Sequence, residues 1–163
     1  MAALVHSQLD YGNSVLVGIP AYLTNRLQSV LNAAARIIYN LKRSDHITDA
    51  LICLHWLRAS ERIKYKVAVL TYKVIHGSAP RYLGTFERIA DRPGCRRLRS
   101  AESYRLQVPP YRLSTIGSRA FPVAGASIWN DLPAEVTSAQ SLPIFRQRLK
   151  SFLFRVSYPD LII

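Results

Sequence analysis

The sequence has little of what several classes of protein depend on. Its 163 residues include two cysteines, Cys53 and Cys95, too few for a disulfide framework or a four-cysteine zinc site. The seven glycines are scattered singly, so no glycine-rich loop is available to bind phosphate. No apolar run approaches the roughly 20 residues that cross a bilayer, and the first residues do not resemble a signal peptide. We therefore expect an intracellular protein without a membrane partner.

Residues arranged for catalysis are also scarce. No Gly-x-Ser-x-Gly elbow is present, and no serine or cysteine has a sequence context that identifies a paired base. Asp10, Asp45 and Asp49 are of the type that binds catalytic metal ions, but none lies in a Tyr-x-Asp-Asp-like turn. We expect capping and surface roles for these carboxylates, with Asp45 at the start of a helix.

The other candidate metal ligands form an incomplete set. Cys53 and His55, with His46 nearby, supply at most half of a tetrahedral zinc site, and the second half is missing. We expect a buried thiol and a packed imidazole here. Together with the missing catalytic motifs, this predicts no enzyme activity, no metal, no cofactor and no small-molecule substrate.

Acidic residues are few relative to basic ones. The chain has 10 Asp and Glu against 22 Lys and Arg, a formal net charge of +12. The excess is mainly arginine, whose guanidinium suits bidentate contacts with phosphate. Nine arginines against three acidic residues give residues 81–119 a charge of +6, half of the total. The expected partner is a polyanion, RNA or DNA.

The periodicity of the apolar residues predicts a mainly α fold, with a small helical bundle in the first half. The clearest helix is expected at 21–39, and a second at 60–75, with Ser60 as N-cap and Gly77 as stop. Shorter helices are expected at 2–9 and 45–54, and further helices at 119–129 and 141–154. The apolar stripe of the first long helix comprises Leu23, Leu27, Val30, Leu31, Ala34, Ile37 and Ile38.

The middle of the chain has a different pattern. Residues 92–100 are rich in charge and turn formers and predict an exposed loop. Residues 104–108 alternate polar and apolar and predict one short edge strand, which Pro109 and Pro110 end. We therefore expect three segments: a helical segment at 1–86, a basic loop and short strand at 87–118, and a C-terminal helical segment at 119–163.

Three consecutive blocks in the last third carry a resemblance to a known family. They are Gly117-x-Arg119-Ala120-Phe121, Trp129-Asn130-x-Leu132-Pro133 and Ser141-Leu142-x-x-Phe145-Arg146-x-x-Leu149-Lys150. In this order and spacing they resemble the C-terminal segment of the reverse transcriptases of LINE-type (non-LTR) retrotransposons. Further blocks extend the resemblance over about residues 6–154, among them Leu54-His55-Trp56-Leu57 and His76-Gly77-Ser78-Ala79-Pro80. The chain departs from the family pattern at Arg58, where proline is common, and at Gly12, where cysteine is frequent.

The resemblance implies a non-catalytic region, because the polymerase palm and its catalytic aspartates would lie upstream of Met1. It also implies a role in holding nucleic acid. The candidate contacts are Arg92, Arg96, Arg97, Arg99, Arg105 and Arg112, interleaved with Tyr82, Tyr104 and Tyr111 as stacking surfaces. No base-reading motif distinguishes RNA from DNA.

Other interpretations of the same residues stay open. The arginines also fit a solvated basic loop that keeps the chain soluble. The chain also fits a helical protein-interaction module that docks on a partner such as its own upstream polymerase domain, or a retroelement remnant without function. For Trp56 and Trp129 we expect structural positions in the core, because each stands among apolar or turn-forming neighbours.

Overall fold

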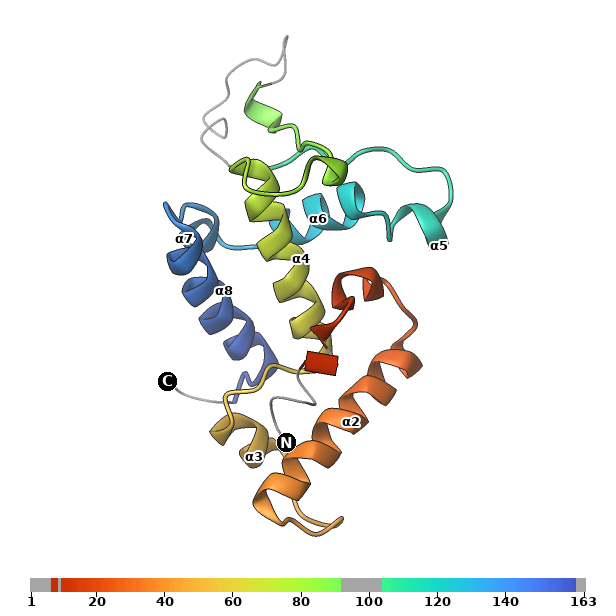
Figure 1. Cartoon of the computed structure of the whole chain (residues 1–163), viewed down its shortest axis with the longest axis vertical. Coiled ribbons are helices and arrows are strands. Elements are labelled where there is room, and N and C mark those ends of the chain that lie inside the picture. Colours follow the sequence, from red (N-terminus) through yellow and green to blue (C-terminus); the bar gives the residue numbers. More distant parts are fainter. Residues whose placement is uncertain (1–6, 9, 92–103, 161–163) are drawn as a thin grey trace. The chain divides into compact units, whose positions relative to one another are not determined.

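The computed structural model describes residues 7–8, 10–91 and 104–160, and in these residues it is mainly α-helical (Figure 1). This confirms the predicted fold class. Among the described residues no sheet forms, and no helix is both long and apolar enough to cross a membrane. The elements are η1 (Asn13–Leu16), α2 (Ala21–Tyr39), α3 (Thr48–Cys53), α4 (Ala59–Ile75), η2 (Arg81–Leu83), η3 (Ile89–Asp91), α5 (Ser114–Gly117), α6 (Phe121–Asn130), α7 (Ala134–Thr137) and α8 (Leu142–Ser157).

The chain divides into two compact units. The first unit contains the described residues up to Lys64 and those from Ser151 onward. The second unit is Tyr65–Lys150. The boundaries fall within α4 and α8, so each of these helices contributes residues to both units.

Helix α2 has the bounds that its periodicity predicts. It begins after Pro20 and ends at Asn40, whose left-handed backbone (φ 50°) closes the helix. The Leu41 N–H donates to the Arg36 carbonyl at 3.0 Å, the long bond of a Schellman-type end, for which asparagine is a suitable residue. The helix predicted at 2–9 falls mostly outside the described residues.

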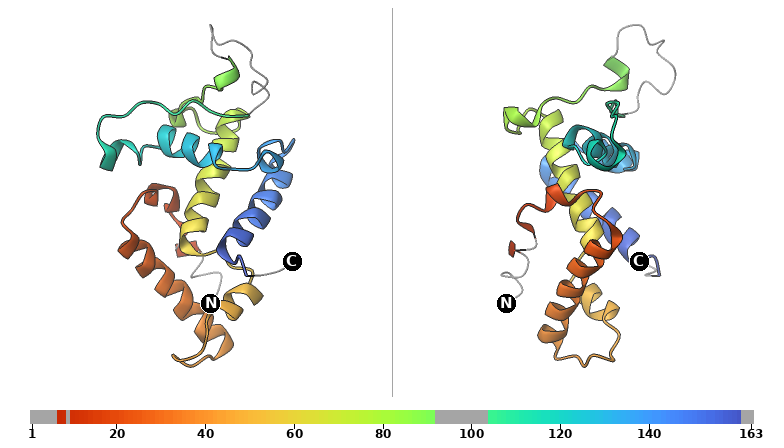
Figure 2. Two further views of the ribbon diagram at one scale, coloured as in Figure 1. Left: turned by 180° about the vertical axis from the view of Figure 1, so that it is seen from behind. Right: turned by 90° about the vertical axis from the view of Figure 1, so that its right-hand side faces the viewer.

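The expected apolar stripe of α2 is only partly buried, which corrects the prediction. Leu31, Ala34 and Ala35 are buried, but Val30 and Ile37 are 48% and 62% exposed. The neighbour of this face is α3, which lies beside the C-terminal part of α2 (Figure 2). With only six residues, α3 covers a narrow strip of α2. Periodicity gives the width of an apolar stripe but not how much of it a neighbour covers.

Two further expectations for the first unit are wrong. Helix α3 begins at Thr48, and Asp45 instead accepts a hydrogen bond from the Lys42 N–H at 2.7 Å in the preceding turn. Cys53 is exposed, because Ala50 and Leu51 form the buried face of α3. The His55 ring is also largely exposed, although it stacks against Phe154 with a centroid separation of 6.0 Å.

The core of the first unit joins residues distant in sequence. Its buried members are Leu31, Ala34, Ala35, Ala50, Leu51, Trp56, Ala59 and Tyr158. The Tyr158 hydroxyl donates to the Trp56 carbonyl at 2.8 Å, and the Arg58 guanidinium lies 5.3 Å from the centre of the Tyr158 ring. The Gln28 side chain accepts the Ala59 N–H at 2.8 Å, which satisfies an amide at the start of α4.

The core of the second unit is aromatic. Tyr72 on α4 stacks on Phe145 of α8 at 4.5 Å, and Phe145 lies 5.7 Å from Trp129 of α6. Figure 1 shows α6 crossing the C-terminal part of α4. Gly125 permits this crossing, since a Cβ there would lie 2.7 Å from the Thr71 hydroxyl oxygen. The three aromatic side chains therefore tie α4, α6 and α8 together within this unit.

We predict that the stability of the protein falls at alkaline pH, partly through Tyr158. Burial raises the pKa of Tyr158 above its ordinary value of about 10, and Arg58 offsets part of the rise. The unfolded chain therefore releases this proton first. The contribution of the protonated Tyr158 hydroxyl to the free energy of unfolding is complete below about pH 10 and is lost as the pH rises through the pKa of Tyr158 in the folded state.

Urea denaturation between about pH 9 and about pH 11 tests this prediction. Tyr158→Phe should unfold more easily at neutral pH by about 1 kcal/mol, since the bond to the Trp56 carbonyl is lost. Its stability should also decline less steeply above pH ~10. Some decline should remain, because burial raises the pKa of Tyr65 and Tyr72 as well. An unchanged alkaline slope in the variant would contradict the assignment to Tyr158.

Candidate nucleic-acid interface

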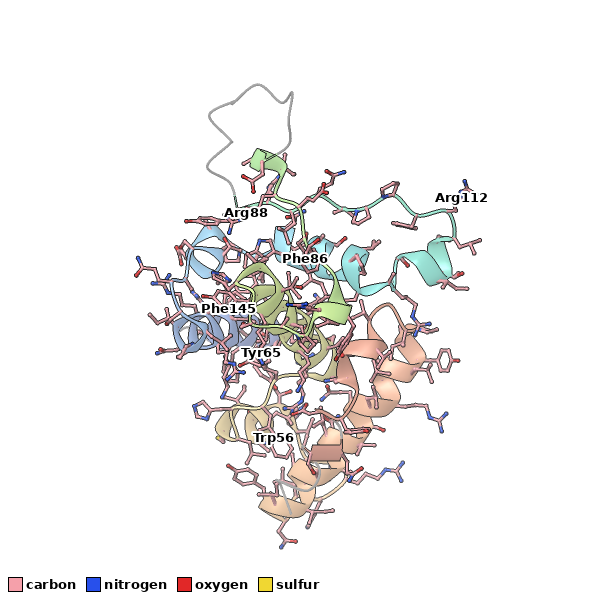
Figure 3. The ribbon with its side chains drawn as sticks, turned by 45° about the horizontal axis from the view of Figure 1, so that its top comes forward. Trp56, Tyr65, Phe86, Arg88, Arg112 and Phe145 are labelled. Carbon is pink, nitrogen blue, oxygen red and sulfur yellow. The ribbon has the colours of Figure 1, made fainter. Side chains whose placement is uncertain are left out.

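The structure describes two of the six arginines proposed from the sequence to contact nucleic acid. Arg105 and Arg112 belong to the second unit, and both are exposed. Arg92, Arg96, Arg97 and Arg99 lie outside the described residues, as does the loop expected at 92–100. Figure 3 shows the Arg112 side chain directed away from the helices of the second unit.

Three further exposed arginines belong to the same unit and were counted in the charge excess, but not among the candidate contacts. Arg81 lies in η2, Arg88 lies just before η3, and Arg119 lies between α5 and α6. The sequence could not identify these three arginines as candidate contacts, because their exposure and their place in the same unit as Arg105 and Arg112 are tertiary properties. Charge density alone was the available signal.

The electrostatics of this surface favour an anionic partner. In the part of the chain that the structure describes, the ion pair found joins Arg62 and Asp10 of the first unit. Arg81, Arg88, Arg105 and Arg112 therefore have no carboxylate partner among the described residues. Cations that no internal acid neutralises attract phosphate most strongly and release counterions when they bind it.

Aromatic and apolar side chains lie exposed among these arginines. Tyr104 and Tyr111 are each nearly half exposed, and Tyr82, next to Arg81, is 85% exposed. Leu113, just before α5, and Ile116, within α5, are also exposed. The surface thus offers both phosphate-binding groups and flat rings on which bases can stack.

The strand expected at 104–108 is reduced to one antiparallel bridge, between Arg88 and Leu106. The Gln107 N–H donates to the Glu87 carbonyl at 2.8 Å, and the Ile89 N–H donates to the Arg105 carbonyl at 3.1 Å. The pairing cannot extend, because η3 begins at Ile89 on one side and Pro109 and Pro110 lack N–H groups on the other. The expected β element is therefore shorter than predicted.

Two neighbouring side chains at the end of α6 hold this segment. The Asn130 amide accepts the Leu106 N–H at 2.8 Å and donates to the Leu106 carbonyl at 2.9 Å. The Trp129 indole N–H donates to the Tyr104 carbonyl at 2.7 Å. We call these three hydrogen bonds the Trp129–Asn130 clamp. They satisfy backbone groups at Tyr104 and at the fully buried Leu106, which are not paired in a sheet. They also fix the backbone on both sides of Arg105.

A close approach of the backbone positions the next arginine. A Cβ at Gly117 would lie 2.6 Å from the Cβ of Tyr111, so the chain around Tyr111 lies directly against Gly117. Downstream, Phe121 meets Phe86 edge-on at 5.5 Å, which packs the start of α6 on the segment that leads to Arg88. Glycine at 117 and phenylalanine at 121 thus shape the backbone that carries Arg112 and Arg88.

The residues weighed as metal ligands form no site in the described structure. Asp10 is engaged by Arg62, with three hydrogen bonds of 2.7–3.2 Å. Within residues 7–8, 10–91 and 104–160, no three His, Cys, Asp or Glu side chains lie close enough together to hold a metal ion. Asp10, one of the three aspartates considered as metal ligands, therefore makes an ion pair with Arg62.

Comparison of the chain with protein-family models, with curated proteins and with solved structures finds no match.

We predict that loss of the Asn130 amide destabilises the second unit. Asn130→Ala leaves the N–H and carbonyl of Leu106 without partners in a buried position, which should cost about 1–3 kcal/mol. Asn130→Asp keeps the acceptor for the Leu106 N–H but places a carboxylate oxygen against the Leu106 carbonyl oxygen, so it should also destabilise the unit. Urea denaturation measures both changes, and Asn25→Ala, at an exposed position of α2, serves as the matched control. Equal stability of Asn130→Ala and the control would show that the two Asn130 bonds of the clamp contribute nothing.

Proposed function

We propose that this chain is the non-catalytic C-terminal region of a LINE-type reverse transcriptase, and that the second unit contributes a basic surface for nucleic acid. The observation that carries the proposal is the set of exposed arginines that have no carboxylate partner among the described residues. Arg81, Arg88, Arg105 and Arg112 lie in one compact unit together with exposed Tyr82, Tyr104 and Tyr111. Phosphate neutralisation and base stacking together are typical of surfaces that bind single strands.

The residues that carry the family resemblance have physical roles that agree with this proposal. Trp129 and Asn130 of the Trp-Asn-x-Leu-Pro block form the clamp on residues 104–106. Gly117 of the Gly-x-Arg-Ala-Phe block contacts the chain at Tyr111. Phe145 of the last block is fully buried against Tyr72 and Trp129. All three blocks therefore support, directly or through the core, the backbone that presents the arginines.

The same geometry suggests how such a surface would act. Arg105 and Arg112 would bind successive parts of a phosphate backbone, because they stand on one continuous segment whose backbone is held at both ends. The tyrosines beside them would stack on unpaired bases. Such contacts hold a strand without reading its sequence, which suits the handling of a template or target by an adjoining polymerase.

We predict a steep salt dependence of binding that decreases when the arginines are removed. For single strands, log K falls with log salt by about 0.7 per phosphate contact. The triple variant Arg88→Ala, Arg105→Ala and Arg112→Ala should therefore bind more weakly at low salt, with a slope smaller by roughly 2. Fluorescence anisotropy with labelled single-stranded RNA and duplex DNA, between about 50 mM and about 200 mM salt, measures both quantities.

A matched variant separates a localised surface from general charge. Arg26→Ala, Arg43→Ala and Arg155→Ala remove the same charge from exposed positions of the first unit. This control should keep the slope of the wild type. Equal losses in the two triple variants would mean that net charge, and not the surface of the second unit, causes binding. No binding at low salt would overturn the proposal.

One observation favours a second candidate function, a protein-interaction module. Tyr22, Val30 and Ile37 of α2 recur at helical spacing and are 64%, 48% and 62% exposed. An exposed apolar helix face of this kind fits a protein partner, such as the polymerase domain of the same element. Light scattering at two concentrations tests self-association through this face, and Val30→Lys with Ile37→Lys should abolish it. A strictly monomeric protein would exclude self-association through this face and leave only docking on a different protein.

A further inference from the structure

A small pocket opens beside the clamp and belongs entirely to the second unit. It is lined by Ile75 and His76 at the end of α4, Arg88 and Tyr104 at the bridge, Trp129 of α6, and residues 137–140, which begin with the last residue of α7. Its volume is about 160 Å³. A cavity of roughly 150 Å³ is enough to hold one benzene ring, whereas pockets for whole drug-sized ligands begin at about 300 Å³. The pocket is therefore the size of a single ring system.

The walls of the pocket suit a flat ring with polar edges. Ile75, Ala139 and Trp129 supply apolar surface, and Tyr104 adds a half-exposed ring. The Trp129 indole N–H already donates to the Tyr104 carbonyl. Trp129 can therefore give a ligand in the pocket apolar contact but no hydrogen bond.

Polar groups in the lining are available for the edge of such a ring. The His76 ring stacks on Tyr72 with centroids 3.9 Å apart, and its Nδ1 lies 2.9 Å from the Tyr72 carbonyl oxygen. A carbonyl only accepts, so Nδ1 carries the proton and Nε2 of the neutral imidazole is an acceptor. Gln140 adds an amide with both donor and acceptor groups.

We propose that this pocket receives one unpaired nucleobase of a single-stranded nucleic acid while the attached phosphate binds Arg88. Tyr104 stacks on the base, and His76 and Gln140 hydrogen-bond its edge. The sugar and phosphate stay outside, because the volume accommodates only the ring. This inference rests on the proposed function and extends it, since it adds a contact to a base where the arginines contact only phosphates.

The test compares two ligands and three variants of the full chain. The ligands are a single-stranded RNA of about ten nucleotides and a sugar–phosphate oligomer of the same length without bases. Ser138→Phe adds a ring at an exposed position of the pocket lining and fills the pocket. Ser127→Phe places the same ring at an exposed position of α6 outside the lining, as the control. Tyr104→Ala removes one wall of the pocket without adding atoms. This variant tests the pocket even if Ser138→Phe does not fold.

The wild type should bind the base-containing oligomer roughly five- to 150-fold more tightly than the abasic one, the effect of one stacked base. Ser138→Phe and Tyr104→Ala should lose this preference, whereas Ser127→Phe should keep it. A single-stranded DNA of the same sequence should also bind more tightly than the abasic oligomer, because the pocket contacts the base and not the sugar.

The other outcomes overturn the inference in distinguishable ways. Equal wild-type affinity for the two oligomers means that only phosphates are bound. The pocket and the stacking on the tyrosines then both fail, and the phosphate-binding arginines of the proposed function stand. A preference that survives in both pocket variants places base stacking elsewhere, for example at Tyr82 or Tyr111. Absence of binding to either oligomer removes the proposed function, and this inference with it.

Discussion

The Trp129–Asn130 clamp is the interaction on which the basic surface depends. Residues 104–112 have one antiparallel bridge and two consecutive prolines, so the segment cannot satisfy its own backbone groups. The clamp supplies three hydrogen bonds to this backbone, each worth on the order of 1 kcal/mol. Trp129 can do this because Phe145 and Tyr72 fix its ring in the core. Core packing thus determines where Arg105 is presented.

The helices could be predicted from the sequence because their signals are local. Helix α2 has its predicted bounds, and α4, α6 and α8 lie close to theirs. The features that were mispredicted depend on tertiary neighbours. The periodicity of α2 predicts an apolar face, but it cannot predict that α3 leaves Val30 and Ile37 exposed. The alternation at 104–108 predicts a strand, but it cannot predict that the neighbouring segment pairs with it at only one bridge.

The candidate interface was predictable in chemistry but not in geometry. Composition identified arginine and tyrosine in residues 81–119, and the structure exposes the described members of that set. Trp129 and Asn130 read in the sequence only as a core anchor and a turn, since a side-chain bond to a backbone group about 25 residues away has no local signature. The pocket is equally non-local, because its lining comes from five separated parts of the chain.

Hydrogen–deuterium exchange of the full chain, with and without single-stranded RNA, tests most directly whether the second unit binds nucleic acid. The central claim predicts that RNA slows exchange in peptides covering 81–89 and 104–119, while the exchange of α2 is unchanged. Slower exchange confined to α2 and α3, with no change in 81–89 and 104–119, would contradict the claim and place binding on the first unit.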